Sequence, residues 1–293
     1  MGNNCLSAAF LLTSLLVGVL ALVFEVQLVE AGETVYIRAD GSVYPPEAPI
    51  SSLDNVTYTF TGNINDPIVV ERDDIVVDGA GFTVNGTGSG NGIDLSGRSN
   101  VTVKNVSVVA FNYGIYLNGG SGNTLIGNNI TANANYGIYL DGSTHNSIIN
   151  NNIANNVGGV KLYDSSDYNN VSGNNITANN WSGILLVSSK HSNMLGNKIT
   201  ANGDYGIMLD GASSNMTLRN NTLAKNEGNF GVLNPWGFSN LMNDVDASNT
   251  VDGKPIYYWI NKRGHDCFLR CGIRCPRKLQ QHHSRKPKPH KQR

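Results

Sequence analysis

The sequence predicts an all-β solenoid in which coils of three short strands stack on one another. The hexapeptide NYGIYL starts at Asn112 and returns at Asn135, and the related segments GGVKLY, SGILLV and DYGIML start at Gly158, Ser182 and Asp204. The glycine before the aliphatic residue of each copy recurs every 22 to 25 residues, at Gly92, Gly114, Gly137, Gly159, Gly183, Gly206 and Gly231. A fixed period of this length is typical of repeat proteins whose units stack.

Each repeat has room for three strands. Residues 68–84 contain three β-branched runs, at 68–70, 75–77 and 82–84, separated by charged or glycine-containing turns. In later repeats the Gly-Ile-x-Leu segment is the first strand. The second strand is expected to begin near Asn100, Asn123, Asn146, Asn170, Asn193 and Asn215. The third is expected to carry Val106, Ile130, Ile153, Ile176, Ile199 and Leu223. Three strands of about four residues with their turns use about 22 residues, and no segment shows a competing helical period.

Strand alternation assigns the two faces of the first strand. In Gly-Ile-Tyr-Leu, Ile and Leu point inward and Tyr points outward, so stacked coils align their aliphatic residues in columns. One internal column is predicted to hold Ile93, Ile115, Ile138, Val160, Ile184 and Ile207. A second is predicted to hold Leu95, Leu117, Leu140, Leu162, Leu186 and Leu209. These two columns are the predicted core.

Asparagines recur at a turn before the third strand. Asn tolerates left-handed backbone conformations, and stacked amides donate to one neighbour and accept from the next. We therefore predict a hydrogen-bonded column of turn amides. Its members are Asn129, Asn152, Asn175, Asn197 and Asn221.

The N-terminal segment has the composition of a secretory signal. The uncharged run from Leu6 to Phe24 is followed by small residues at Val29 and Ala31, which favours cleavage before Gly32 and makes 1–31 a signal peptide. The segment before the run lacks Lys and Arg, and the run is also long enough for a membrane anchor. Residues 32–67 contain a proline-marked loop and one strand near 56–60, and are predicted to cap the first coil.

The repeats are predicted over 68–243, with an incomplete C-terminal region at 244–263 and a different tail at 264–293. Residues 32–261 contain 10 Lys/Arg and 19 Asp/Glu, whereas 262–293 contain 11 Lys/Arg and one acid. Cys267, Cys271 and Cys275 suggest a metal site, but their spacing differs from the common CxxC zinc arrangements. Back-translation from Gly264 with one nucleotide skipped can restore two strands and an Asn-rich turn. We therefore hypothesise that the basic tail is an out-of-frame, non-native product.

The recurring GIxL and NxIxxN elements, followed by VDGKPIYYWINK from Val251 to Lys262, resemble the right-handed parallel β-helix repeat families. The likeness is greatest to the NosD-like group of secreted repeat proteins. It implies a right-handed parallel β-helix of 22–25-residue coils. Members of this group are labelled periplasmic copper-binding proteins or placed with carbohydrate-binding and sugar-hydrolysis modules. That label does not by itself assign chemistry to this chain.

The outward face of the first strand carries the candidate binding residues. Its column holds Asp94, Tyr116, Tyr139, Lys161, Leu185 and Met208. The candidate glycan-binding residues are Tyr113, Tyr116, Tyr136, Tyr139, Trp181 and Tyr205. Aromatic rings offer flat apolar surfaces with a polar group, which suits the faces of sugar rings. The alternative is that tyrosine simply packs well on a β-surface.

Carboxylates after the first strand are weak catalytic candidates. Asp141 and Asp164 lie about one coil apart and could do acid/base chemistry on a glycosidic bond, or hold Ca²⁺ for a lyase with Lys161 as base. Asp141 and Asp210 lie three coils apart, about 14 Å, which is too far for such a pair. The alternative for each Asp is an ordinary turn residue before Gly or Ser. Ca²⁺ is the one cofactor that this pattern allows.

The remaining residues argue against several kinds of functional site. His145 and His191 lie two coils apart, the methionines are scattered, and 32–261 contains no cysteine, so no copper site and no other metal site is predicted there. The sequence shows no nucleophile triad, phosphate-binding loop or nucleic-acid surface. Of ten N-glycosylation sequons, Asn55, Asn85 and Asn180 are the expected acceptors, because many others fall inside the repeats.

Three functions remain open from the sequence. The preferred hypothesis is a secreted, periplasmic or cell-surface module that binds a glycan or serves the envelope structurally, without catalysis. The second is a polysaccharide lyase, hydrolase or epimerase with a site near Asp141, Lys161 and Asp164. The third is a NosD-type copper accessory protein. Regular repeats favour the first hypothesis, because catalytic clefts in such folds are built by long inserted loops.

Overall fold

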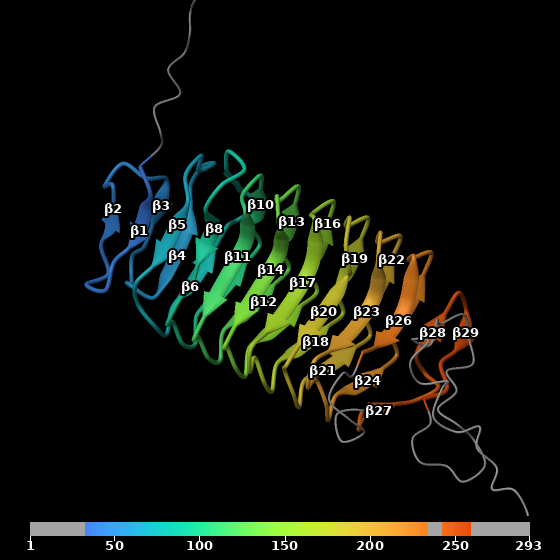
Figure 1. Cartoon of the computed structure of the whole chain (residues 1–293). Coiled ribbons are helices and arrows are strands. Elements are labelled where there is room, and N and C mark those ends of the chain that lie inside the picture. The colour runs from blue at the N-terminus through green and yellow to red at the C-terminus, as the bar shows by residue number, and fades with distance from the viewer. Residues whose placement is uncertain (1–32, 234–241, 259–293) are drawn as a thin grey trace, which may run out of the picture. The chain divides into compact units, whose positions relative to one another are not determined.

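The computed structural model describes residues 33–233 and 242–258, whose coils stack along one axis as a parallel β-solenoid with three sheets running along its length (Figure 1). No helix long and apolar enough to cross a membrane is found among the described residues. Sheet A contains, in order, β2 (Val43–Tyr44), β1 (Val35–Ile37), β5 (Ile68–Val70), β8 (Asn91–Asp94), β11 (Tyr113–Asn118), β14 (Tyr136–Asp141), β17 (Gly158–Tyr163), β20 (Ile184–Val187), β23 (Tyr205–Asp210) and β26 (Gly228–Val232).

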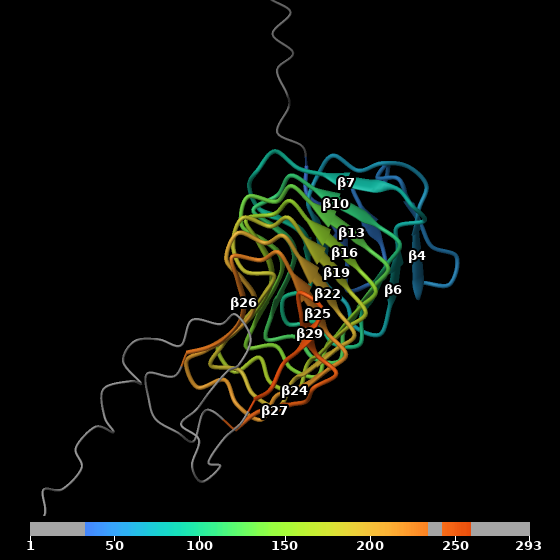
Figure 2. The same ribbon diagram turned by 90° about the vertical axis from the view of Figure 1, so that its right-hand side faces the viewer.

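Sheets B and C hold the second and third strands of each coil. Sheet B contains β3 (Ile50–Ser51), β4 (Thr57–Phe60), β6 (Val76–Asp78), β9 (Thr102–Lys104), β12 (Thr124–Ile126), β15 (Ser147–Ile149), β18 (Asn170–Ser172), β21 (Asn193–Leu195), β24 (Thr217–Arg219) and β27 (Asp244–Val245). Sheet C contains β7 (Thr83–Asn85), β10 (Ser107–Val109), β13 (Asn129–Thr131), β16 (Asn152–Ala154), β19 (Asn175–Thr177), β22 (Lys198–Thr200), β25 (Thr222–Ala224), β28 (Thr250–Val251) and β29 (Lys254–Pro255). Figure 2 shows the strands of sheet C following one another from β7 to β25.

Strands one coil apart pair in parallel, and antiparallel pairs occur at the two ends of the described stack. At the first end β2 pairs antiparallel with β1, and β3 with β4. At the other end β29 pairs antiparallel with β28. Residues 33–67 contribute a coil of their own, because β1 and β4 align in parallel with β5 and β6, and Ile64 bridges Val84. The segment thus continues the stack and also covers its outer strands.

The two predicted core columns of sheet A are confirmed. All twelve side chains, from Ile93 and Leu95 to Ile207 and Leu209, are fully buried. Successive members face each other across the strands, as in the register Ile115 to Ile138 and Leu117 to Leu140. Burying an aliphatic side chain of this size contributes about 1.5–3 kcal/mol to stability.

Two details of the predicted register are wrong. The third-strand column begins at Val108, which pairs with Ile130, and not at Val106, which lies at the preceding corner. In the last repeat Phe230 pairs with Ile207, so Gly231 faces Met208 and does not continue the glycine column. Both errors are shifts of two residues, which preserve the face of the strand and are therefore invisible to the alternation pattern.

The glycine column marks a close approach between sheets A and C. A Cβ on Gly159 would lie 2.2 Å from the carbonyl oxygen of Gly183 and 2.8 Å from the side chain of Ile176. Gly114 and Gly137 meet the equivalent groups of the next coil, at 2.5 Å and 3.2 Å from the carbonyl oxygens that follow them. Real Cβ atoms do not approach backbone as closely as at Gly114 and Gly159, and at Gly137 the side chain of Ile153 would lie at 2.8 Å, so glycine allows the coils to stack here.

Asparagine side chains form three buried columns, one at each corner of the coil. They are Asn123, Asn146 and Asn169; Asn128, Asn151, Asn174, Asn197, Asn221 and Asn249; and Asn133, Asn156, Asn179, Asn202 and Asn226. We call these columns the amide ladders. In each step the Asn side-chain oxygen accepts from the backbone and side-chain nitrogens of the preceding coil, as Asn151 does from Asn128 at 2.9 and 3.0 Å.

The predicted turn ladder mixed two different columns. Asn197 and Asn221 belong to the second amide ladder. Asn129, Asn152 and Asn175 instead form an outward column on sheet C, in which each Nδ2 donates to the preceding coil. The repeat contains adjacent asparagines, and strand alternation sends one inward and the next outward.

Candidate functional site

The outward face of sheet A holds the candidate side chains where the alternation predicts them. Tyr116 pairs with Asp94 and Tyr139, Tyr139 with Lys161, Lys161 with Leu185, and Leu185 with Met208. Because each pair is one parallel strand apart, these residues form one continuous outward column. The strands of sheet A that carry this column lie side by side along several coils (Figure 1).

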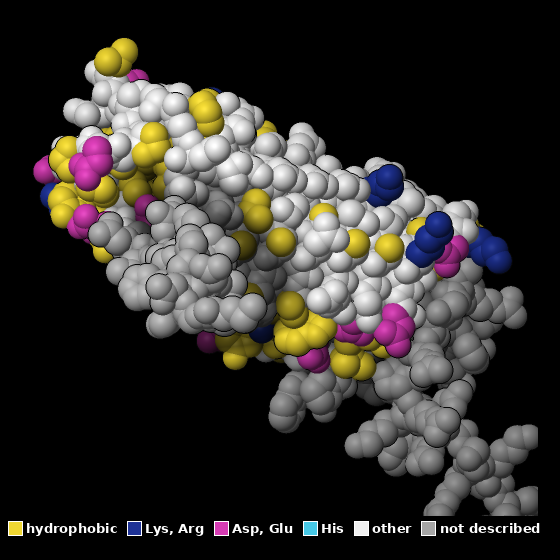
Figure 3. Space-filling view, turned by 90° about the horizontal axis from the view of Figure 1, so that it is seen from above, with side chains coloured by type: hydrophobic (Ala, Val, Ile, Leu, Met, Phe, Trp, Pro, Cys, Tyr) yellow, Lys and Arg dark blue, Asp and Glu magenta, His cyan; other side chains and the backbone are white. Residues whose placement is uncertain are grey.

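Six aromatic side chains gather on this face, and we call them the tyrosine patch. They are Tyr113, Tyr116, Tyr136, Tyr139, Tyr163 and Trp181. The Tyr113 ring centroid lies 5.4 Å from that of Tyr116 and 4.9 Å from that of Tyr139, with the planes nearly parallel. Trp181 meets Tyr136 edge-on at 6.1 Å and is 52% exposed. Figure 3 shows hydrophobic and acidic side chains side by side along the lower edge of the described surface.

The structure changes the membership of this patch relative to the sequence prediction. Tyr163 belongs to it, since its ring lies 6.3 Å from that of Tyr139 and is 37% exposed. Its position two residues after Lys161 is the signal that could have found it, because that spacing keeps a side chain on the same face. Tyr205 lies on sheet A but packs over Gly228 and Gly231, without a ring contact to the patch.

Lys161 lies at the centre of the patch. Its ammonium nitrogen is 5.3 Å from the ring centroid of Tyr136, 5.2 Å from that of Tyr139 and 4.7 Å from that of Tyr163. A cation over aromatic rings at these distances is attracted by their negative faces. Partial burial lowers the pKa of Lys161, and the charge of Asp141 opposes that shift.

The tyrosines beneath Lys161 are held in the neutral form. Burial, with a smaller contribution from the charge of Asp204, raises the pKa of Tyr136 to about 12. Burial and the charge of Asp141 raise the pKa of Tyr139 still further. Gly158 makes this burial of Tyr136 possible, since a Cβ there would lie 2.2 Å from the Tyr136 ring.

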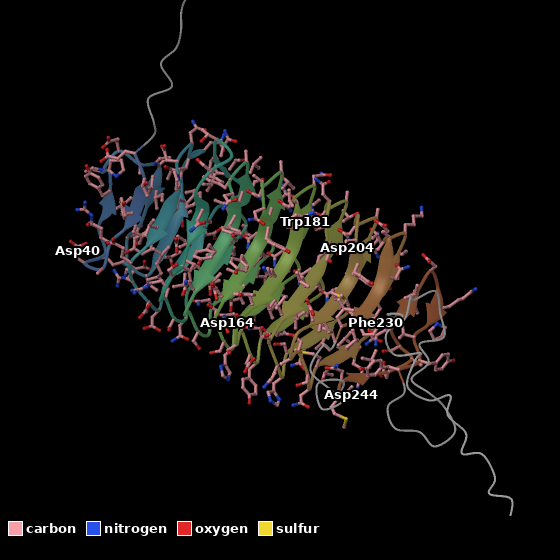
Figure 4. All side chains as sticks on the ribbon, in the orientation of Figure 1. Asp40, Asp164, Trp181, Asp204, Phe230 and Asp244 are labelled. Carbon is pink, nitrogen blue, oxygen red and sulfur yellow. The ribbon has the colours of Figure 1, made fainter. Side chains whose placement is uncertain are left out.

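Acidic side chains border the patch at both ends of the strands. Asp141 faces Tyr163 in register, and Asp164 follows one residue later with a left-handed backbone. Burial first, and then the charge of Asp164, raises the pKa of Asp141, while Lys161 lowers it. At the opposite end Asp204 accepts a 2.7 Å hydrogen bond from the Ser182 hydroxyl. Figure 4 shows Trp181 and Asp204 at one end of the strands and Asp164 at the other.

The aromatic ring of Tyr168 lies between the two histidines that were considered for a metal site. The Tyr168 ring stacks on the His145 ring at 5.1 Å and on the His191 ring at 4.8 Å. All three residues have positive φ, and they occupy the equivalent turn of three successive coils. The histidines therefore lie two coils apart, as the sequence indicates. Among residues 33–233 and 242–258, no group of three or more His, Cys, Asp or Glu side chains could hold a metal ion.

The sequon asparagines differ in how their side chains are used. Asn55, Asn85 and Asn180 are exposed, as expected for acceptors. The side-chain nitrogens of Asn129 and Asn175 donate within the outward column of sheet C, and that of Asn100 donates to Asp74. The predicted signal peptide, the tail after Gly264 and its cysteines lie outside the described residues.

The chain belongs to the NosD family. The sequence model of this family, described as periplasmic copper-binding protein (NosD), matches residues 51–240. A search of curated proteins finds no match.

Solved structures with a similar fold act on polysaccharides. The periplasmic alginate epimerase AlgG is 20% identical, with a TM-score of 0.52 over 63% of this chain and 47% of that one. A mutant of the same epimerase is 19% identical, with a TM-score of 0.50 over 62% and 50% of the chains. An alginate lyase from Paenibacillus sp. strain FPU-7 is 15% identical, with a TM-score of 0.45 over 66% and 90%. This chain spans about half the length of the epimerases, and at such identities the likeness shows the fold alone.

Proposed function

We propose that this protein is an exported glycan-binding β-helix, acting in the periplasm or at the cell surface, which holds a polysaccharide on the tyrosine patch without cleaving it. The observation that carries the proposal is the cluster of six aromatic side chains on the outward face of sheet A, in which Trp181 and Tyr163 are exposed, Tyr113 and Tyr116 are half-buried, and Tyr136 and Tyr139 are buried beneath them. Single surface aromatics are ordinary, whereas aromatic side chains that contact one another and reach the surface are typical of interaction sites. The word periplasmic in the family description supports the location, and the similar fold of an alginate epimerase supports the ligand class.

The geometry of the patch suits an extended sugar chain. Its residues come from successive parallel strands, which are spaced about 4.8 Å apart. Trp181 and Tyr163 expose ring surface at opposite ends of the strands, while Tyr136 and Tyr139 form the buried floor between them. Tyrosine and tryptophan rings can bury apolar surface against a sugar ring and also form hydrogen bonds through their hydroxyl and indole N–H groups.

Catalysis is the less favoured alternative. Asp141 faces Tyr163, and neither Asp141 nor Asp164 is hydrogen-bonded to Lys161 in the described part of the chain. Lys161 has the lowered pKa of a potential base, and Asp141 the raised pKa of a potential acid, which is why turnover needs a direct assay. Copper chemistry gains no support from the described residues, which offer no convergent ligand set.

The test is binding of the full chain to a panel of immobilised polysaccharides, combined with assays for new reducing ends and unsaturated products. We expect binding without turnover. Trp181→Ala should weaken binding about tenfold, the loss expected for one exposed aromatic anchor. Tyr168→Ala is the matched control, since Tyr168 is equally exposed at 52% but lies on another surface.

Two outcomes would contradict the proposal. Equal loss of binding in Trp181→Ala and Tyr168→Ala would show that the patch is not the binding surface. Turnover that is abolished by Asp141→Asn or Lys161→Ala would establish the enzyme alternative.

We also expect EDTA to leave binding unchanged, since the patch residues need no metal to contact a sugar.

A further inference from the structure

Lys161 is a cation whose position is fixed by rings and not by an anion. The ion pairs of the described residues join Arg98 to Asp73, Lys104 to Asp78, and Arg219 to Asp244 and Asp246. Within that part of the chain, no carboxylate oxygen lies within 4.0 Å of the Lys161 ammonium. Its three N–H groups therefore have no acidic side chain as their acceptor.

The surroundings of Lys161 favour an incoming anion. Tyr136, Tyr139 and Tyr163 hold the ammonium, so little side-chain entropy remains to be lost when an ion pair forms. The site is partly desolvated, and an ion pair there is stronger than one in bulk water. Asp141, Asp164 and Asp204 oppose an anion from the two ends of the strands, so only an anion placed over the centre gains from Lys161.

We propose that Lys161 selects glycans that carry a carboxylate, by pairing its ammonium with the carboxylate of an acidic sugar whose ring lies against the tyrosine patch. This inference rests on the proposed glycan-binding function and adds the ligand's charge to it. Neutral glycans would use the same rings but leave Lys161 without its partner. A carboxylated sugar satisfies the ammonium and the aromatic surface together.

Calorimetric titration of the full chain with two matched ligands tests this proposal. One is a hexamer of galacturonic acid, and the other is the same hexamer with its carboxyl groups reduced to alcohols. We expect the carboxylated hexamer to bind about tenfold more tightly, as expected for one charge-assisted hydrogen bond. The preference should disappear in Lys161→Gln and persist in Lys161→Arg.

Lys198→Gln is the matched control, because Lys198 is an exposed strand lysine on sheet C. Thermal unfolding checks that each variant is folded, and a fall of the preference with rising salt on the wild-type chain tests the ion pair without any substitution. Equal binding of both hexamers, with loss of both in Trp181→Ala, would overturn the role of Lys161 while leaving the proposed function standing. Failure of both hexamers and of every glycan in the panel would overturn the two together.

Discussion

Individual tyrosines on sheet A are held in an environment that stabilises their protonated form. Tyr136 is only 5% exposed, and its pKa is raised from 10.0 to about 12, chiefly by burial. The folded protein keeps this proton at a pH where the unfolded chain has lost it. The stabilisation is therefore complete below about pH 10 and is lost as the pH rises through about 12.

Urea unfolding between pH 9 and pH 12 should reveal this linkage. A shift of two pKa units corresponds to about 3 kcal/mol of differential stability. We expect the free energy of unfolding to fall with pH, and to fall less steeply in Tyr136→Phe, which lacks the ionisable group. An unchanged slope in Tyr136→Phe would show that this hydroxyl is not protected in the folded state.

Gly159 lies where two successive coils approach each other too closely for a side chain. Gly159→Ala would place a methyl group 2.2 Å from the backbone of Gly183, which cannot move without disturbing the sheet. We expect a loss of about 1–3 kcal/mol, the usual cost of overpacking. Gly62→Ala is the control, because its Cβ would meet only two side-chain atoms of Pro49, at 3.4 and 3.9 Å. Equal effects in chemical denaturation would argue against the close approach as the reason for glycine.

At the scale of the element, the amide ladders explain the asparagine content. Asn151 is 1% exposed, accepts two hydrogen bonds from Asn128, and donates to Asn174 and to the carbonyl of Leu125. Buried polar groups without partners cost about 1–3 kcal/mol each. The ladders therefore make each corner residue dependent on the coils before and after it.

Asn151→Ala should destabilise the protein by several kcal/mol, because it leaves the buried backbone N–H of Asn128 without its acceptor and removes one hydrogen-bond partner each from the Asn128 side chain and the Leu125 carbonyl. Asn152→Ala, one residue away on the outward column, should cost less than about 1 kcal/mol, since water replaces its lost hydrogen bonds. Thermal and urea unfolding of the two variants would compare them directly. Similar losses in both would contradict the distinction between buried and outward columns.

The elements differ in how far the sequence determines them. Alternation and period predict the strands and the Ile and Leu columns of sheet A, because a buried face tolerates no other pattern. They do not distinguish Asn128 from Asn129, since the choice depends on which of two adjacent amides turns inward at a corner. The sequence analysis also missed Tyr163 as a member of the tyrosine patch. Tyr163 lies at the end of its strand, after the repeated motif, where the outward face continues for one more residue. The side-by-side placement of Trp181 and Tyr136 depends on the packing of two different coils.

The whole molecule is a stack in which each coil contacts mainly its neighbours. Stability in such architectures is close to a sum of unit and interface contributions. The central coils, from β11 to β23, have complete partners on both sides, whereas β27, β28 and β29 are strands of two residues. The tyrosine patch lies on the central coils, where the backbone is most completely paired.

Amide hydrogen exchange should follow this arrangement. We expect the slowest exchange at Asn128, Asn151 and Asn174, whose backbone N–H groups donate to buried side chains of the next coil. Exchange should be faster in β27 to β29. In Asn151→Ala, protection should fall first in the adjacent coils and later in distant ones. A uniform fall along the whole stack would instead indicate a single cooperative unit.

The amide ladders give the stack a direction as well as cohesion. Each side-chain oxygen accepts from the preceding coil, and each side-chain nitrogen donates to the following one, from Asn128 through to Asn249. The hydrogen bonds between side-chain amides therefore run in the same direction at every junction between coils. A duplicated coil inserted into the stack would meet complementary donors and acceptors on both of its faces. The length of the outward face of sheet A can thus change by whole coils while the chemistry of each junction stays the same.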